Sequence, residues 1–283
     1  GAAITAMSHH REMAEDRNCS YVFFTSELLL PYISEAEGAW PALILAMDKA
    51  GFSEVSILLV LRDPVDQLIS LYRHRGRRGT AGRIDQWVRE GYRLPADLAA
   101  LREGTESASV DPIVRAYNRR PGGLEKIFFQ DWLKIEPPSS IVRGDINPSP
   151  SLSELELLRQ INAIRPALVP YLQERLGRVS STEKVQGGPL MAHAEALAEQ
   201  VVRKDRDEWL YWNELLPPGE TLAIPEGFPE IPCWPEEVCF SDMQMAGLAD
   251  FIATSGQPRF LLYLFWRTRV RRLLGQVKRL LFG

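Results

Sequence analysis

The feature of the sequence that most constrains the fold is a short apolar run that ends at an arginine and leads straight into a helix start. Residues 57–61 read Ile-Leu-Leu-Val-Leu. This run is too short to cross a membrane and is typical of a strand buried on both faces in a parallel sheet. Asp63 and Pro64 follow at positions typical of a helix N-cap and a first helical residue. The sequence therefore predicts a strand, a short turn and a helix, which indicates an α/β fold.

The turn and the helix carry groups that suit an anionic ligand. Arg62 lies in the turn, where a guanidinium can bind a phosphate through two hydrogen bonds. Ser70 offers a hydroxyl beside the apolar face that the helix is expected to bury, which is formed by Val65, Leu68, Ile69 and Tyr72. Six basic residues and no acid lie between Gln67 and Ile84; they are Arg73, His74, Arg75, Arg77, Arg78 and Arg83. Because open α/β sheets bind ligands at the carboxyl ends of their strands, we expect a polyanion here.

Three segments of the chain, taken in order, carry a resemblance to a known family. Residues 24–27 read Phe-Thr-Ser-Glu, residues 62–72 fit the pattern R-D-P-x-D-x-x-x-S-x-Y, and residues 147–162 are similar to N-x-S-L-S-x-x-x-L-x-L-L-R-x-x-N. Together they resemble the sulfotransferase family over residues 20–175. The resemblance is greatest to the bacterial branch that acts on glycans and other hydroxylated acceptors.

The resemblance implies a fold, a donor and a set of site residues. The implied fold is α/β, a three-layer parallel sheet of the P-loop nucleotide-binding type flanked by helices, with a mostly helical C-terminal part. Arg62 and Ser70 match the residues that bind the 3′-phosphate of the donor, 3′-phosphoadenosine 5′-phosphosulfate. The implied acceptor is a hydroxylated small molecule or a glycan, and no metal is required.

Glu27 is the expected catalytic base. It follows a predicted strand at 20–25, and a carboxylate there would face the same edge of the sheet as Arg62. Sulfuryl transfer needs a group that takes the proton of the acceptor hydroxyl, and glutamate has this role in several glycan-directed members of the family. Glu27 also fits a second interpretation, a cap of the helical turn that follows it.

One element of the family is missing from the sequence, the 5′-phosphosulfate loop of the P-K-S/T-G-T type. We expect this loop and its strand to precede Gly1. Two other functions stay open at this stage. One is a P-loop kinase-like phosphotransferase, for which Asp63 is the candidate magnesium-binding acid. The other is a non-catalytic nucleotide-binding or membrane-surface protein.

The charge and the prolines predict three regions: a sulfotransferase-like domain at 1–216, a proline-rich connector at 217–240 and a helical tail at 241–283. The tail contains a basic amphipathic helix within 259–282, which suits either an anionic membrane surface or a partner chain. Residues 1–250 carry 26 basic and 37 acidic residues, since seven of the 33 basic residues lie in the tail. This acidic body argues against nucleic acid as a partner. Three cysteines without a disulfide framework favour a cytoplasmic protein, with membrane association through the tail.

Apolar periodicity predicts the other elements of the chain. A third strand is expected at 124–130. Helices are expected at 2–17, 38–51, 84–92, 94–102, 112–119, 152–165, 167–176, 189–215 and 241–254.

Overall fold

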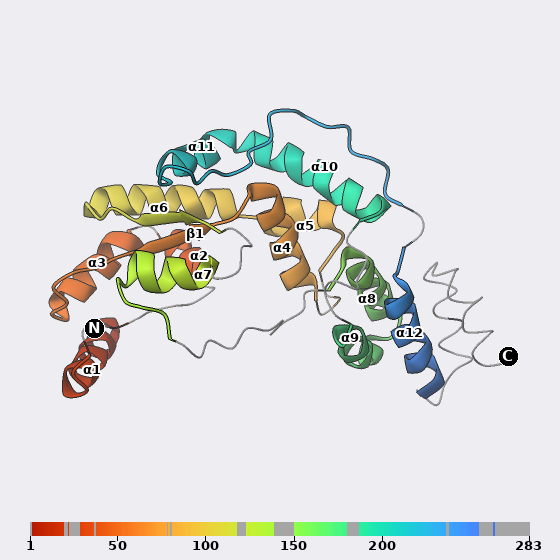
Figure 1. Ribbon diagram of the computed structural model, residues 1–283, viewed down its shortest axis with the longest axis horizontal. Coiled ribbons are helices and arrows are strands. Elements are labelled where there is room, and N and C mark those ends of the chain that lie inside the picture. Colours follow the sequence, from red (N-terminus) through yellow and green to blue (C-terminus); the bar gives the residue numbers. More distant parts are fainter. Residues whose placement is uncertain are drawn as a thin grey trace. The chain divides into compact units, whose positions relative to one another are not determined.

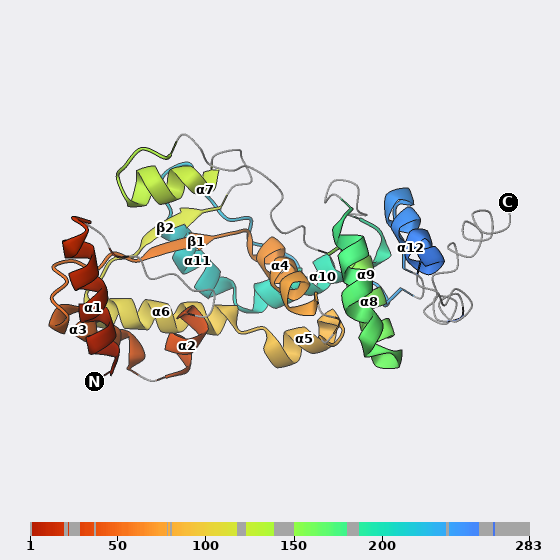
Figure 2. The same ribbon diagram turned by 90° about the horizontal axis from the view of Figure 1, so that it is seen from below.

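The computed structural model describes most of the chain as two compact units (Figures 1 and 2). The described residues are 2–19, 22, 29–36, 38–77, 79, 81–117, 123–138, 150–179, 187–235, 238–254 and 263. The first unit comprises Gly1–Asp63, Arg93–Pro138 and Asp205–Ile224. The second unit comprises Pro64–Tyr92, Ser139–Lys204 and Pro225–Gly283.

The first unit contains two strands and several helices. The strands are β1 (Leu58–Leu61) and β2 (Ile113–Ala116). The helices are α1 (Ala2–Asp16), α2 (Leu29–Glu35), α3 (Ala39–Lys49), α6 (Leu94–Ala108), α7 (Gly123–Glu125), the π-helix η1 (Lys126–Trp132) and α11 (Arg206–Glu214).

The second unit contains helices and no strand in its described part. Its elements are α4 (Pro64–Gly76), α5 (Ile84–Gly91), α8 (Leu152–Ile164), the 3₁₀-helix η2 (Pro166–Leu168), α9 (Val169–Gly177), α10 (Pro189–Lys204) and α12 (Asp242–Thr254). The predicted strand at 57–61, the helix start at Pro64 and most of the predicted helices are therefore confirmed.

β1 and β2 pair in parallel, with Leu58 opposite Ile113 and Leu61 opposite Ala116 (Figure 2). The helix predicted at 112–119 is therefore wrong, since β2 occupies its centre. Ile113 and Val114 are β-branched and suit a pleated strand, but the pairing with β1 decides the outcome. The described residues thus form a mixed α/β structure that is mostly helical and has a two-stranded parallel sheet.

The strand predicted at 124–130 is also wrong, because these residues are helical. Helix α7 continues into η1, where the rings of Phe128 and Trp132 lie edge to face with centroids 5.3 Å apart. Ile127 is buried in the same turn. A short apolar run does not distinguish a strand from a buried helix. The strand predicted at 20–25 lies outside the described residues except for Val22.

Helices α3 and α6 pack closely in the first unit, where Trp40 of α3 lies against Gly104 of α6. Trp40 is buried, and a Cβ atom placed on Gly104 would lie 2.4 Å from its Cβ and Cγ atoms. A polar contact joins α6 to α11, in which Arg102 forms an ion pair of 3.2 Å with Glu208. Trp209 of α11 is fully buried beside it.

Two capping boxes interlock in the second unit, at the N-termini of α8 and α12. Ser151 and Glu154 form the first box, and Ser241 and Gln244 make the same pair of contacts at α12. Gln244 also donates hydrogen bonds of 3.1 Å to Ser151 and 2.8 Å to Glu154. Glu154 and Gln244 are fully buried, so each box satisfies polar groups of the other.

The contact between α3 and α6 predicts the outcome of one substitution. Gly104→Ala should lower the free energy of unfolding by roughly 1–3 kcal/mol, because its methyl group overlaps the Trp40 side chain. In an open helix the same change is stabilising. Gly177→Ala in α9 is the control, since a Cβ atom there meets nothing within 4 Å. Urea unfolding followed by circular dichroism would measure both variants, and an unchanged midpoint for Gly104→Ala would refute the close packing.

Candidate functional site

Arg62 lies at the carboxyl end of β1 in the first unit. The register that pairs Leu61 with Ala116 brings the next residue of each strand together, and Tyr117 donates a backbone hydrogen bond of 2.5 Å to Leu61. The Arg62 Cζ atom lies 4.7 Å from the centroid of the Tyr117 ring. A guanidinium stacked on a ring keeps its in-plane N–H groups available to a ligand. Arg62 is half-buried and forms no ion pair within the described part of the chain.

The connector brings two further groups to this end of the sheet. Glu220 Oε2 accepts a hydrogen bond of 2.7 Å from the backbone N–H of Ala116, which is 104 residues away in sequence. Asp63 Oδ1 accepts one of 2.7 Å from the backbone N–H of Ala223. Residues 220–223 therefore lie beside the strand ends. The interpretation of 217–240 as a plain connector missed this, because no local pattern marks it.

Glu220 protects the outer edge of β2. In a parallel pair, alternate N–H groups of a strand point away from its partner. The Ala116 N–H is one of these, and Glu220 satisfies it, while the Glu220 carboxylate also lies 3.9 Å from Nε of Arg115. Arg115 forms a shorter ion pair of 3.2 Å with Asp131 of η1. Charged side chains thus lie along this edge of the sheet, and one of them satisfies an outward N–H group of β2.

Ser70 and Glu27 are the other predicted site residues. Ser70 is half-buried on α4, in the second unit, next to the buried Ile69. Its pairing with Arg62 on one phosphate stays a prediction. Glu27, the expected base, lies outside the described residues, and so does the basic helix of the tail except for Tyr263. Among the expected cations, Arg73 donates a hydrogen bond of 2.7 Å to the carbonyl of Pro150.

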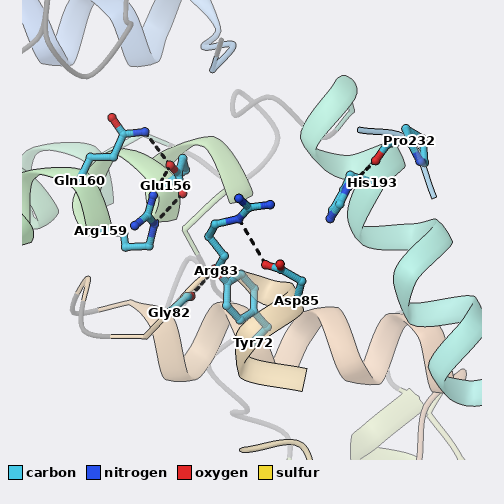
Figure 3. Close-up of polar contacts among 9 residues, drawn as sticks. All are labelled: Tyr72, Gly82, Arg83, Asp85, Glu156, Arg159, Gln160, His193 and Pro232. Atoms are coloured by element: carbon cyan, nitrogen blue, oxygen red, sulfur yellow. Dashed lines mark hydrogen bonds and ion pairs between the residues drawn. The ribbon is translucent and has the colours of Figure 1, made fainter. Parts of the chain in front are cut away.

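A cluster of charged side chains in the second unit was not predicted from the sequence (Figure 3). Its centre is Glu156 of α8, which is 5% exposed. Arg159 donates two hydrogen bonds to it, of 2.8 and 2.7 Å, and Gln160 donates a third of 2.6 Å. The two oxygens of Glu156 are therefore committed to partners one turn away on the same helix. The Glu-x-x-Arg spacing of Glu156 and Arg159 was the sequence signal for this cluster. Such pairs are common on helices, so the spacing alone does not identify a site.

Tyr72 of α4 belongs to the same cluster. Its hydroxyl donates a hydrogen bond of 3.1 Å to the carbonyl of Gly82 (Figure 3). Burial raises the pKa of the Tyr72 hydroxyl above its ordinary value, and the negative charge of Glu156 raises it further. The hydroxyl therefore stays protonated at neutral pH and acts as a hydrogen-bond donor.

Arg83 lies on the more exposed side of this cluster. It forms an ion pair of 3.3 Å with Asp85, and its Cζ atom lies 3.9 Å from the centroid of the Trp234 ring. The side chain of Arg83 is 38% exposed. With Tyr72 protonated and Glu156 held by Arg159, the cluster offers hydrogen-bond donors and ordered geometry rather than a free base.

Comparison of this chain with protein-family models, with curated proteins and with solved structures finds no match. None of the helices that the structure describes is long and apolar enough to span a membrane.

The burial of Tyr72 predicts a pH dependence of stability. Above about pH 10, the ordinary pKa of tyrosine, the unfolded chain releases this proton while the folded chain keeps it. The stability associated with Tyr72 is therefore present below pH 10 and is lost as the pH rises. Urea unfolding at pH 8 and at pH 10.5 should show a larger loss for the wild-type chain than for Tyr72→Phe.

Tyr171→Phe is the matched control for this measurement, because Tyr171 is 64% exposed. That variant should lose as much stability between the two pH values as the wild-type chain. An equal loss in wild type and Tyr72→Phe would contradict the effect of burial on the Tyr72 pKa.

Proposed function

We propose that this chain is a sulfotransferase, which moves a sulfuryl group from 3′-phosphoadenosine 5′-phosphosulfate to a hydroxyl of a glycan or other acceptor. The observation that carries the proposal is the setting of Arg62 at the carboxyl end of β1. There, Arg62 stacks on Tyr117 at the carboxyl end of a parallel strand, and it forms no ion pair within the described residues. A cation held in this way is a good partner for a phosphate.

The proposed fold extends the two described strands. We place β1 and β2 in a larger three-layer parallel sheet of the P-loop type, with the donor lying across the carboxyl ends of the strands. The 3′-phosphate would bind Arg62 and the Ser70 hydroxyl. Both assignments come from the R-D-P-x-D-x-x-x-S-x-Y motif, and the geometry at Arg62 supports the first.

The proposed reaction is an in-line transfer. The acceptor oxygen attacks sulfur and forms the new S–O bond while the bond from sulfur to the bridging phosphate oxygen breaks. The hydroxyl proton goes to a base, for which Glu27 is proposed, and adenosine 3′,5′-bisphosphate leaves with the negative charge. Positioning and cationic hydrogen-bond donors supply most of the rate enhancement in such a reaction.

Calorimetric titration with adenosine 3′,5′-bisphosphate tests the role of Arg62. Arg62→Ala should weaken binding by about tenfold or more, because it removes a charge-assisted contact to the 3′-phosphate. Ser70→Ala should weaken it by less, since it removes one hydrogen-bond donor and no positive charge. Arg89→Ala is the control, because Arg89 is an exposed arginine of α5 outside the basic stretch that follows β1, and this variant should bind like the wild-type chain.

The same titrations distinguish the proposal from its rivals. Tighter binding of ATP with magnesium than of the bisphosphate would favour a phosphotransferase. Equal binding of the bisphosphate by the wild-type chain and by Arg62→Ala would remove the 3′-phosphate contact on which the proposal rests.

A further inference from the structure

A proline-rich segment lies along helix α10 in the second unit. We call residues 225–235 the strap; they have no helix or strand and include Pro225, Pro229, Pro232 and Pro235. Three side chains of α10 hold it by hydrogen bonds to its backbone carbonyls. Arg203 donates to Glu226 at 3.0 Å, Gln200 donates to Pro229 at 2.7 Å, and the Nδ1 atom of His193 contacts Pro232 at 2.7 Å.

The spacing of these contacts indicates the conformation of the strap. The accepting carbonyls belong to residues 226, 229 and 232, so they recur every three residues. A polyproline II helix has three residues per turn, which places such carbonyls along one edge. The prolines fix φ near the value that this helix requires.

The donors on α10 form a matching row. Residues 193, 200 and 203 are separated by seven and three positions, so they lie on one face of the helix. The later donor contacts the earlier acceptor, so the strap runs antiparallel to α10. All three hydrogen bonds are made to backbone carbonyls of an extended chain, and none involves a side chain of the strap.

Two aromatic side chains of the strap add contacts to cations and rings. The Cζ atom of Arg203 lies 5.4 Å from the centroid of the Phe228 ring. Trp234 packs edge to face on His193, with centroids 5.0 Å apart, and Arg83 stacks on the same indole. The interaction of an arginine guanidinium with the face of an aromatic ring is attractive.

His193 is the most buried of the three donors, at 6% exposed. Because a carbonyl only accepts, the contact to Pro232 requires the proton on Nδ1 (Figure 3). Its buried Nε2 atom has no hydrogen-bond partner within the described residues. The hydrogen bond to Pro232 therefore offsets part of the cost of burying this ring, and it ties the helix to the strap.

Most of the strap is exposed to solvent, although Trp234 is half-buried and packs against the hydrophobic core of the second unit. All of its residues lie in the described part of the chain, and none is fully buried; Phe228 is 63% exposed. A segment with so little buried surface leaves its binding face at a small free-energy cost.

We propose that this face of α10 is a recognition site for an extended proline-rich segment, which the strap occupies within its own chain and which a proline-rich segment of a partner protein occupies when the strap leaves. The partner segment needs a polyproline II conformation, which places every third backbone carbonyl along one edge, and an aromatic residue that contacts Arg203 or His193. Proline-rich segments are established peptide ligands because their polyproline II conformation is already formed before they bind. The site is independent of the proposed sulfotransferase activity.

The probe is a fluorescein-labelled peptide of residues 225–235 in which Cys233 is replaced by serine. It is titrated, with fluorescence anisotropy as the readout, into the full chain and into a full-chain variant carrying Phe228→Ala and Pro232→Gly. Both substitutions fall on exposed residues, so they weaken the strap without disturbing the core. The peptide should bind the variant about tenfold more tightly than the wild-type chain, because the intact strap competes for the site.

Two controls test where the peptide binds. Adding Gln200→Ala and Arg203→Ala to the variant should weaken binding about tenfold, whereas adding Glu195→Ala, an exposed residue of α10, should not change it. A peptide with glycine at the positions of Pro229 and Pro232 should also bind about tenfold more weakly. The proposal is overturned if the variant is folded by circular dichroism and does not bind, if the Gln200 and Arg203 substitutions have no effect, or if the glycine peptide binds equally.

Discussion

The parallel pairing of β1 with β2 is the constraint on which the first unit depends. It aligns the carboxyl ends of two strands that are far apart in sequence, and so sets Arg62 against the ring of Tyr117. Two strands alone do not form a stable sheet. Trp40 of α3 and Trp209 and Trp212 of α11 are buried in the same unit, and Glu220 satisfies the edge N–H of Ala116. The residue that we assign to the donor phosphate thus rests on long-range contacts rather than on its own loop.

In the second unit, side chains satisfy backbone groups that regular structure leaves unpaired. The interlocked capping boxes do this for the starts of α8 and α12, where buried Glu154 and Gln244 serve both helices. Helix α10 does it for the carbonyls of the strap. The two residues that link the capping boxes are fully buried, whereas most residues of the strap are exposed. We therefore expect the capping boxes to be a fixed part of the core and the strap to be replaceable.

The sequence predicted the elements whose signals are local. The strand at 57–61 and the helix from Pro64 follow from an apolar run and a helix-start pattern, and both are confirmed. The predictions failed where a distant partner decides the structure, as at β2, or where an apolar run fits two structures, as at η1. The contact of Glu220 with Ala116 spans 104 residues and has no local signal. Arg62 is found at a strand end as predicted, while its pairing with Ser70 stays a prediction.

Hydrogen–deuterium exchange of the full chain, with and without adenosine 3′,5′-bisphosphate, tests the central claim most directly. If the donor binds at the strand ends, the ligand should slow exchange in peptides that cover residues 58–66 and 113–117, because it orders the backbone around Arg62 and Tyr117. The strap and α12 should exchange as before. Binding that slows exchange elsewhere and leaves both of these peptides unchanged would contradict the assignment of the donor site to the junction of β1 and α4.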